Sequence, residues 1–195
     1  MTSPPTAQAR DTSLRQRIVL AAIEATSQGG WSAVTMGAVA DRVGVSRQTV
    51  YNEVGTKPEL AEAVVAHELA GFLALVDLAF DAHPEDPVAA IHAAALSVLV
   101  RAGENELLRA VVSATQGGDT ELLPLLTTNS IALIDAATSI VSGRLSLAVP
   151  RLGADRLALT ADVIVRTVLS HLMQPARSPQ QTAAGIAEAA RLLLA

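Results

Sequence analysis

One segment, TMGAVADRVGVSRQTVYNEVGTK from Thr35 to Lys57, constrains the fold more than any other part of the chain. Thr35 is suited to cap a short helix, Gly44 to end it in a tight turn, and Ser46 to cap a second helix. Ala40, Val43, Val45 and Val50 supply its inward apolar positions, and Trp31 and Met36 are expected to fill the core beside them. Two short helices joined by a glycine turn predict a helix-turn-helix unit.

The second helix of this segment has few apolar residues to bury and many hydrogen-bonding groups to offer. Its polar positions are Ser46, Arg47, Gln48, Thr49, Tyr51 and Asn52. Arg and Gln side chains match the donor and acceptor pattern of base edges in the major groove. We therefore predict that this helix binds duplex DNA and that Arg47 and Gln48 contact bases. A helix-turn-helix retained only for packing would have no reason to expose these side chains.

Phosphate contacts are expected at the edges of the same unit. The backbone amides at the start of the first helix, near Thr35, can bind a phosphate because helix amino termini attract anions. Lys57 lies just beyond the second helix, where it can contact the neighbouring phosphate. Tyr51 can contact a phosphate with its hydroxyl or a thymine methyl with its ring.

The rest of the chain is predicted to be helical, because half of it is apolar while aromatic residues make up only 2%. Capping residues, glycines and prolines divide it into about nine helices, and no segment has the pattern of a strand. Besides the two helices above, the expected helices cover 13–29, 56–81, 86 to about 103, 104–115, 120–149, 154–173 and 178–195.

Charge divides the chain into a basic head and an acidic body. Residues 1–12 are expected to be a disordered arm, since they include two prolines and show no apolar period. Residues 1–57 carry six basic and four acidic side chains, whereas 58–195 carry eight basic and fifteen acidic ones. This asymmetry fits a chain that turns one end toward phosphates, although such small counts also arise by chance.

Several classes of function have no support in the sequence. There is no cysteine, and the four histidines lack metal-ligand spacing such as HExxH. No glycine-rich phosphate loop follows a strand and no nucleophile elbow is present, so we expect no enzyme activity and no cofactor. Apolar runs are interrupted before the ~18 residues of a membrane span, and the polar amino terminus has no secretory signal. A cytoplasmic protein without membrane contact is expected.

The segment from Arg17 to Leu60 resembles the DNA-binding domain of the TetR family of bacterial transcription regulators. The matching positions are Ile18, Ala21-Ala22, Gly30-Trp31, Thr35-Met36, Ala40, Gly44-Val45-Ser46, Thr49-Val50-Tyr51, Lys57 and Leu60. The chain departs from the family pattern at Glu53 and Val54, where the family usually has His or Tyr followed by Phe. Glu53 removes one phosphate contact and adds a negative charge.

The resemblance implies a helix-turn-helix domain over 13–57 and a helical ligand-binding and dimerisation domain over 58–195. It implies a homodimer whose interface is formed by the last two helices of each copy. It also implies that the dimer binds a pseudo-palindromic operator, and it favours repression. The sequence agrees, because 154–173 and 178–195 are apolar on more than one face. A monomer with both helices in its own core is the alternative.

The ligand class is the least constrained part of the prediction. The body of the chain is aliphatic, and Phe72 and Phe80 are its only phenylalanines, so an alkyl or fatty-acyl ligand is favoured. The expected pocket residues are Phe72, Leu108, Val112, Leu126, Asn129 and Ile134. A polar or aromatic inducer, or a helical protein-interaction adaptor without an inducer, are the alternatives.

Overall fold

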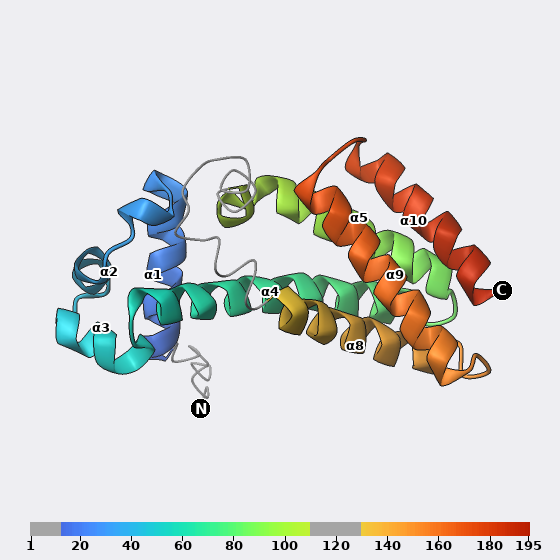
Figure 1. The fold of residues 1–195 in the computed structure, drawn as a ribbon, viewed down its shortest axis with the longest axis horizontal. Coiled ribbons are helices and arrows are strands. Elements are labelled where there is room, and N and C mark those ends of the chain that lie inside the picture. The colour runs from blue at the N-terminus through green and yellow to red at the C-terminus, as the bar shows by residue number, and fades with distance from the viewer. Residues whose placement is uncertain (1–12, 110–129) are drawn as a thin grey trace, which may run out of the picture. The chain divides into compact units, whose positions relative to one another are not determined.

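The computed structural model describes residues 13–109 and 130–195, and every regular element in these two ranges is a helix. Nine helical elements are described, which confirms the predicted all-α class (Figure 1). They are α1 (Leu14–Gly29), the 3₁₀-helix η1 (Trp31–Ala33), α2 (Met36–Val43), α3 (Arg47–Val54), α4 (Lys57–Ala82), α5 (Pro87–Glu104), α8 (Ser130–Ala148), α9 (Ala154–Met173) and α10 (Pro179–Leu194). The expected arm and most of 104–129 lie outside the described residues.

The helices begin where the sequence places capping residues. Ser13, Thr35, Ser46 and Asp86 each accept a hydrogen bond from a backbone N–H in the first turn that follows. At the start of α10 a complete capping box is present. The Ser178 side chain accepts from the backbone N–H of Gln181, and the Gln181 side chain accepts from the backbone N–H of Ser178. Local side-chain chemistry therefore determines most of the helix starts.

The chain forms two compact units, Met1–Val64 and Val65–Ala195, and the boundary between them lies within α4. In the first unit Trp31, Met36 and Val50 are buried, as the sequence predicts. Val45 is only half-buried, because it lies in the turn between Gly44 and the Ser46 cap, outside both helices.

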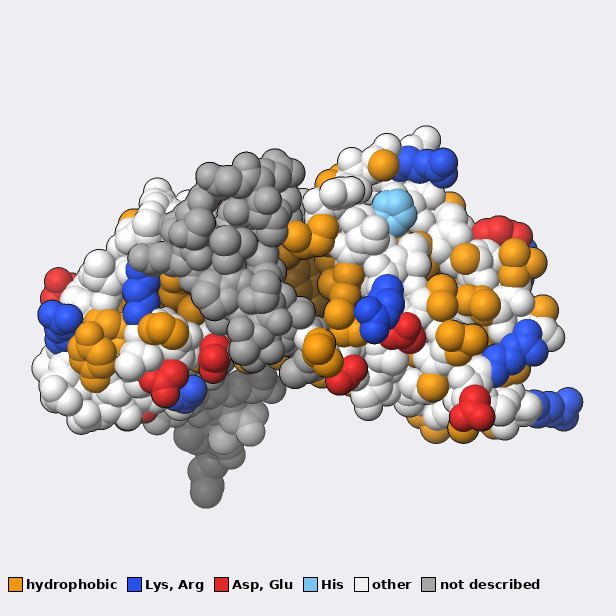
Figure 2. All heavy atoms as spheres, viewed as in Figure 1, with side chains coloured by type: hydrophobic (Ala, Val, Ile, Leu, Met, Phe, Trp, Pro, Cys, Tyr) orange, Lys and Arg blue, Asp and Glu red, His pale blue; other side chains and the backbone are white. Residues whose placement is uncertain are grey.

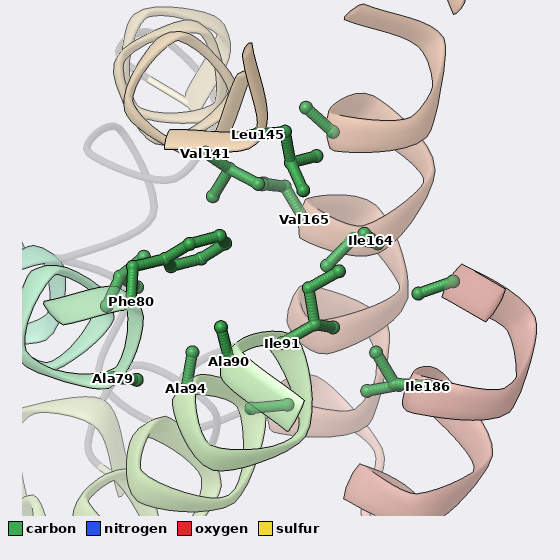
Figure 3. Packing of buried hydrophobic residues seen from close by; sticks show 14 of the residues in the cluster. Ala79, Phe80, Ala90, Ile91, Ala94, Val141, Leu145, Ile164, Val165 and Ile186 are labelled. Atoms are coloured by element: carbon green, nitrogen blue, oxygen red, sulfur yellow. The ribbon is translucent and has the colours of Figure 1, made fainter. Parts of the chain in front are cut away.

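The second unit is built on two close helix pairs, in which α10 packs along α5 and α8 packs along α9. Alanines on α5, including Ala90 and Ala94, allow the close approach. Figure 3 shows the ring of Phe80 from α4 pointing toward Val141 of α8, among side chains of α5, α8 and α9. The aliphatic core expected from the composition is present.

Helix α4 is more continuously apolar than predicted from the sequence. Among the described helices, it alone is long and apolar enough by length and composition to cross a bilayer. The same test is passed by helices in the cores of soluble proteins. Both acidic side chains of its central part, Glu68 and Asp77, pair with arginines of neighbouring helices.

A glycine at the junction of α3 and α4 yields a stability prediction. Gly55 has φ 78° and ψ −138°, and a Cβ there would lie 2.6 Å from Cδ of Glu59. We expect Gly55→Ala to lower the free energy of unfolding by about 1–3 kcal/mol, because this backbone conformation is essentially restricted to glycine.

The measurement is urea denaturation of the full chain. Gly37→Ala is the matched control, because a Cβ at Gly37 in α2 approaches no atom closer than 3.9 Å. The control should gain about 0.5–1 kcal/mol from the better helix former. A Gly55→Ala midpoint equal to that of the wild type would contradict the expectation.

Candidate functional site

Helix α3 presents one buried face and one polar face. Val50 and Val54 are 0% and 3% exposed and hold the helix against the first unit. On the other face Arg47, Gln48 and Asn52 are exposed. Thr49 and Tyr51 are half-buried at the edges of this face, and the Ser46 cap is exposed. All six side chains predicted for this helix are therefore accessible at least in part.

The exposed side chains of α3 are paired with one another one turn apart. Arg47 Nη2 donates to the Tyr51 hydroxyl at 3.2 Å, and the guanidinium lies 5.5 Å from the centroid of the Tyr51 ring. Gln48 Nε2 donates to Asn52 Oδ1 at 3.0 Å. These contacts orient the guanidinium and the amides before any ligand arrives. A guanidinium has five N–H groups, so one contact leaves donors for a base or a phosphate.

The turn between α2 and α3 is fixed by a glycine and by two backbone hydrogen bonds. Gly44 has φ 77° and ψ 37°, the left-handed conformation that ends α2. The N–H groups of Gly44 and Val45 both donate to the carbonyl of Ala40, at 2.9 and 3.0 Å. At the other end of α2, the exposed Thr35 accepts from the N–H of Ala38 at 3.1 Å. This uses the Thr35 hydroxyl as a cap.

The start of α4 contributes Lys57 to the same unit. Its ammonium lies 5.6 Å from the centroid of the Trp31 ring. The side chain predicted to contact a DNA phosphate is therefore placed over an aromatic face. Two residues later, hydrogen bonds from the backbone N–H and the hydroxyl of Thr56 lower the pKa of the Glu59 carboxyl. The carboxylate accepts these bonds at 2.7 and 2.8 Å and caps the helix.

Two arginines of α1 have partners that the sequence analysis missed. Arg17 Nη2 donates to the carbonyl of Val43 at 2.8 Å, and Arg15 Nη1 donates to the carbonyl of Glu53. In the sequence both residues counted only as positive charge. A contact across 26 or 38 residues leaves no local signal that could have shown it.

The second unit has an apolar cavity of about 130 Å³, partly open to the surface, between α4, α5, α8 and α9. Every described side chain lining it is apolar, and the lining includes Phe72, Phe80, Ile91, Val141, Ile164 and Leu172. Among the described residues, no group of three acidic or histidine side chains could hold a metal ion.

The structure separates the residues predicted for the pocket. Phe72 lines the apolar cavity, whereas Leu108 lines a different cleft beside Arg109 and His171. Ile134 is partly buried against the same core but is not among the residues that line the cavity. Val112, Leu126 and Asn129 lie outside the described residues.

Charged pairs join α4 to its neighbours on both sides of this cavity. The Glu68 carboxylate accepts from Asn105 Nδ2 at 2.6 Å and lies 3.5 Å from Arg101 Nη2. The Arg101 guanidinium also lies 5.3 Å from the centroid of the Phe72 ring. These contacts connect α4 to α5 and to Asn105, the residue that follows α5.

On the α8 side, Arg144 donates to Asp77 at 2.7 Å and to Asp81 at 2.8 Å. The hydrogen bond to Asp77 is the main cause of the raised pKa of Arg144. The α8 contact is therefore a forked pair with two short bonds, whereas the Arg101–Glu68 contact is long.

Helices α9 and α10 bury one face and expose apolar side chains on another. Leu157, Ala161 and Ile164 of α9 are buried in the core. Yet Leu159 is 59% exposed and Leu192 of α10 is 69% exposed. Val163 and Leu169 of α9 are also exposed. Figure 2 shows hydrophobic side chains on the face of the second unit that carries these helices.

Comparison with known proteins agrees with this architecture. Residues 18–64 match the model of bacterial regulatory proteins of the tetR family, and 86–191 match the C-terminal domain of the bacterial tetracyclin repressor. The chain is 28% identical over 191 residues to the HTH-type transcriptional regulator AlkX of Mycobacterium tuberculosis, covering 94% of this chain and 86% of that protein.

Solved structures agree as well. The TetR family repressor AlkX of Dietzia sp., described as implicated in biodegradation of n-alkanes, is 31% identical with a TM-score of 0.76. The match covers 93% of this chain and 95% of that one. A putative TetR-family regulator of Mesorhizobium loti has a TM-score of 0.68 at 17% identity, over 97% and 98% of the two chains, and shows the same fold.

The fold and the polar helix thus define a helix-turn-helix regulator of transcription. The matches extend over both units of the chain. The chain belongs to the TetR family of bacterial transcriptional regulators, whose members bind operator DNA and act as dimers.

Proposed function

We propose that the protein is a cytoplasmic homodimeric repressor, released from a pseudo-palindromic operator by a small alkyl or fatty-acyl ligand. The observation that carries DNA recognition is the donor-rich face of α3, which is exposed beside a left-handed turn. An adaptor that binds only protein would leave this face without a role. A mobility-shift assay with the DNA upstream of the protein's own gene separates the two functions.

On this proposal Arg47 and Gln48 contact base edges, and Ser46, Thr49 and Asn52 extend the same surface. Lys57, Tyr51 and the backbone amides after Thr35 position the phosphate backbone. Two copies of α3 then read half-sites about 34–36 Å apart, one turn of the duplex. The position of Lys57 on the Trp31 ring supports its role, because the ring restricts where the ammonium can lie.

The second copy is proposed to cover α9 and α10. These helices bury one face in the core of the second unit and expose Leu159, Val163 and Leu192 on another. A helix that is apolar on two faces is suited to pack against two partners. The four helices of two protomers would form the interface.

The ligand is proposed to occupy the cavity beside Phe72 and Phe80, where apolar walls suit an alkyl chain. The similarity to the Dietzia repressor, which is implicated in biodegradation of n-alkanes, supports an alkyl ligand. The cavity of about 130 Å³ is comparable to one that binds benzene, so a longer chain must widen it.

Widening the cavity is proposed to move α4. Because Glu68 joins α4 to α5 and Arg144 joins it to α8, an enlarged cavity must strain one of these contacts. On the α5 side Glu68 is held by a long contact to Arg101 at 3.5 Å and by a short hydrogen bond from Asn105 at 2.6 Å. Since α4 continues to Lys57 in the first unit, its movement alters the DNA-binding unit. Ligand and operator then weaken each other by the same factor.

The dimer interface predicts a loss of both dimer and operator binding. Replacing Leu159 and Val163 together by Asp should give monomers, because two charges would be buried at the interface. Light scattering measures the mass, and anisotropy of labelled operator measures binding. Leu78→Asp, at a 64% exposed position on α4, is the matched control and should remain dimeric. A double variant that is still dimeric would refute this interface.

The two classes of DNA contact predict different effects of substitution. Arg47→Ala should weaken operator binding by roughly 1–3 kcal/mol and relax base preference. Lys57→Ala should weaken all DNA sequences alike and lower the salt slope of binding by about one. Fluorescence anisotropy over a series of salt concentrations measures both quantities. Unchanged operator affinity in Arg47→Ala would remove that residue from the interface.

The cavity predicts a variant that binds DNA but does not respond to ligand. Ala137→Leu should fill part of the cavity, because Ala137 lines it from α8. Dodecanoic acid and dodecane are titrated into the protein–operator complex. Each should lower the operator affinity of the wild type roughly 5–150-fold and change that of Ala137→Leu less. Ala136→Leu, at the exposed neighbouring position, is the control and should respond as the wild type does.

The alkyl ligand class has a clear contrary result. If naphthalene or a polar compound dissociates the complex and neither dodecyl compound does, the alkyl class is wrong. If Ala137→Leu responds fully to a dodecyl compound, the ligand lies elsewhere in the protein.

A further inference from the structure

Two arginines on α1 end on the backbone of the helix-turn-helix rather than on acidic side chains. Arg17 donates to the carbonyl of Val43, the last residue of α2, at 2.8 Å. Arg15 donates to the carbonyl of Glu53, in the last turn of α3. Helix α1 therefore supplies a cation to the carboxyl end of each helix of the helix-turn-helix.

These carbonyls need such partners. The last four carbonyls of an α-helix have no intrahelical donor, and the carboxyl end carries the negative end of the helix dipole. In α2 the turn amides of Gly44 and Val45 both bind the carbonyl of Ala40, which leaves that of Val43 to Arg17. In α3 the backbone N–H of Gly55 donates to the carbonyl of Tyr51, and the carbonyl of Glu53 accepts from Arg15.

The spacing of the two arginines lets one helix reach two helix ends. Arg15 and Arg17 are two residues apart on α1, so their side chains leave the helix about 200° apart. The buried stripe of α1, formed by Ile18, Ala22 and their neighbours, lies between them. Each guanidinium thus extends from a different edge of the stripe.

We propose that Arg15 and Arg17 form an orientation clamp, which sets the angle between α2 and α3 and so the pose of α3 on DNA. They are positioning residues that act through the two helix ends. The competing role is direct contact with phosphates, because both side chains are exposed. The inference rests on the proposed reading of DNA by α3, and its first test does not involve DNA.

The first measurement is amide hydrogen exchange of the full chain for Arg15→Met, Arg17→Met and the double variant. The clamp predicts faster exchange in residues 43–55, with no change in the second unit. Arg42→Met is the matched control. It removes one positive charge from the same unit, but Arg42 pairs with Glu24 at 3.3 Å and donates to the side-chain Oε1 of Gln28 rather than to a backbone carbonyl at a helix end. Its exchange over 43–55 should be that of the wild type.

The second measurement is operator binding against salt concentration. The clamp predicts that each single variant loses about tenfold in affinity, as expected for one charge-assisted hydrogen bond, with an unchanged salt slope. Two lost phosphate contacts would instead lower the slope of the double variant by about two. Replacing both residues by Lys, which keeps a donor, should restore the protection of 43–55 even if the Met variants fold poorly.

Three results would overturn the clamp. Exchange over 43–55 that is unchanged in the double Met variant excludes it, and so does a salt slope that falls by about two. Failure of the Lys variant to restore protection also counts against it. If the wild type binds no DNA in the mobility-shift assay, the reading of DNA by α3 fails, whereas the exchange result still tests the clamp by itself.

Discussion

The DNA-binding unit depends on satisfying the ends of two helices that are too short to be stable alone. Helices α2 and α3 have eight residues each, and isolated helices of this length are marginal in water. Thr35 and Ser46 bind the free amides at the amino ends, and Gly44 closes the first carboxyl end. The apolar contacts of Val50 then hold α3 with its polar face outward.

The second unit follows a different constraint, because its helices are long and its core is aliphatic. Alanines on α5 allow close helix approach, but small side chains cannot fill the space opposite the two phenylalanines of α4. An apolar cavity remains between four helices, bordered by charged contacts of Glu68 and Arg144. The same helix therefore lines the cavity and pairs with α5 through Glu68 and with α8 through Asp77 and Asp81.

Helix α4 gives the two units a common element. Leu60 and Val64 are buried in the first unit, whereas Val76 and Phe80 are buried in the core of the second. This continuity is the physical basis for coupling between ligand and operator in the proposed function.

The sequence by itself determined the local features. The caps at Thr35, Ser46 and Ser178, the turn at Gly44 and the all-α class follow from interactions between residues at most a few positions apart. The spacing of Thr35, Gly44 and Ser46, with the other matching positions between Arg17 and Leu60, also carried the family resemblance. Such contacts can be predicted because helix geometry relates positions three or four residues apart.

Tertiary structure decided which distant residues meet. Lys57 rests on Trp31, Arg17 reaches Val43, and Phe72 and Leu108 line different spaces although both were expected in one pocket. Periodicity identifies the apolar side of a helix but not its neighbour or the angle at which they cross. These contacts depend on that angle, so only the packed structure could establish them.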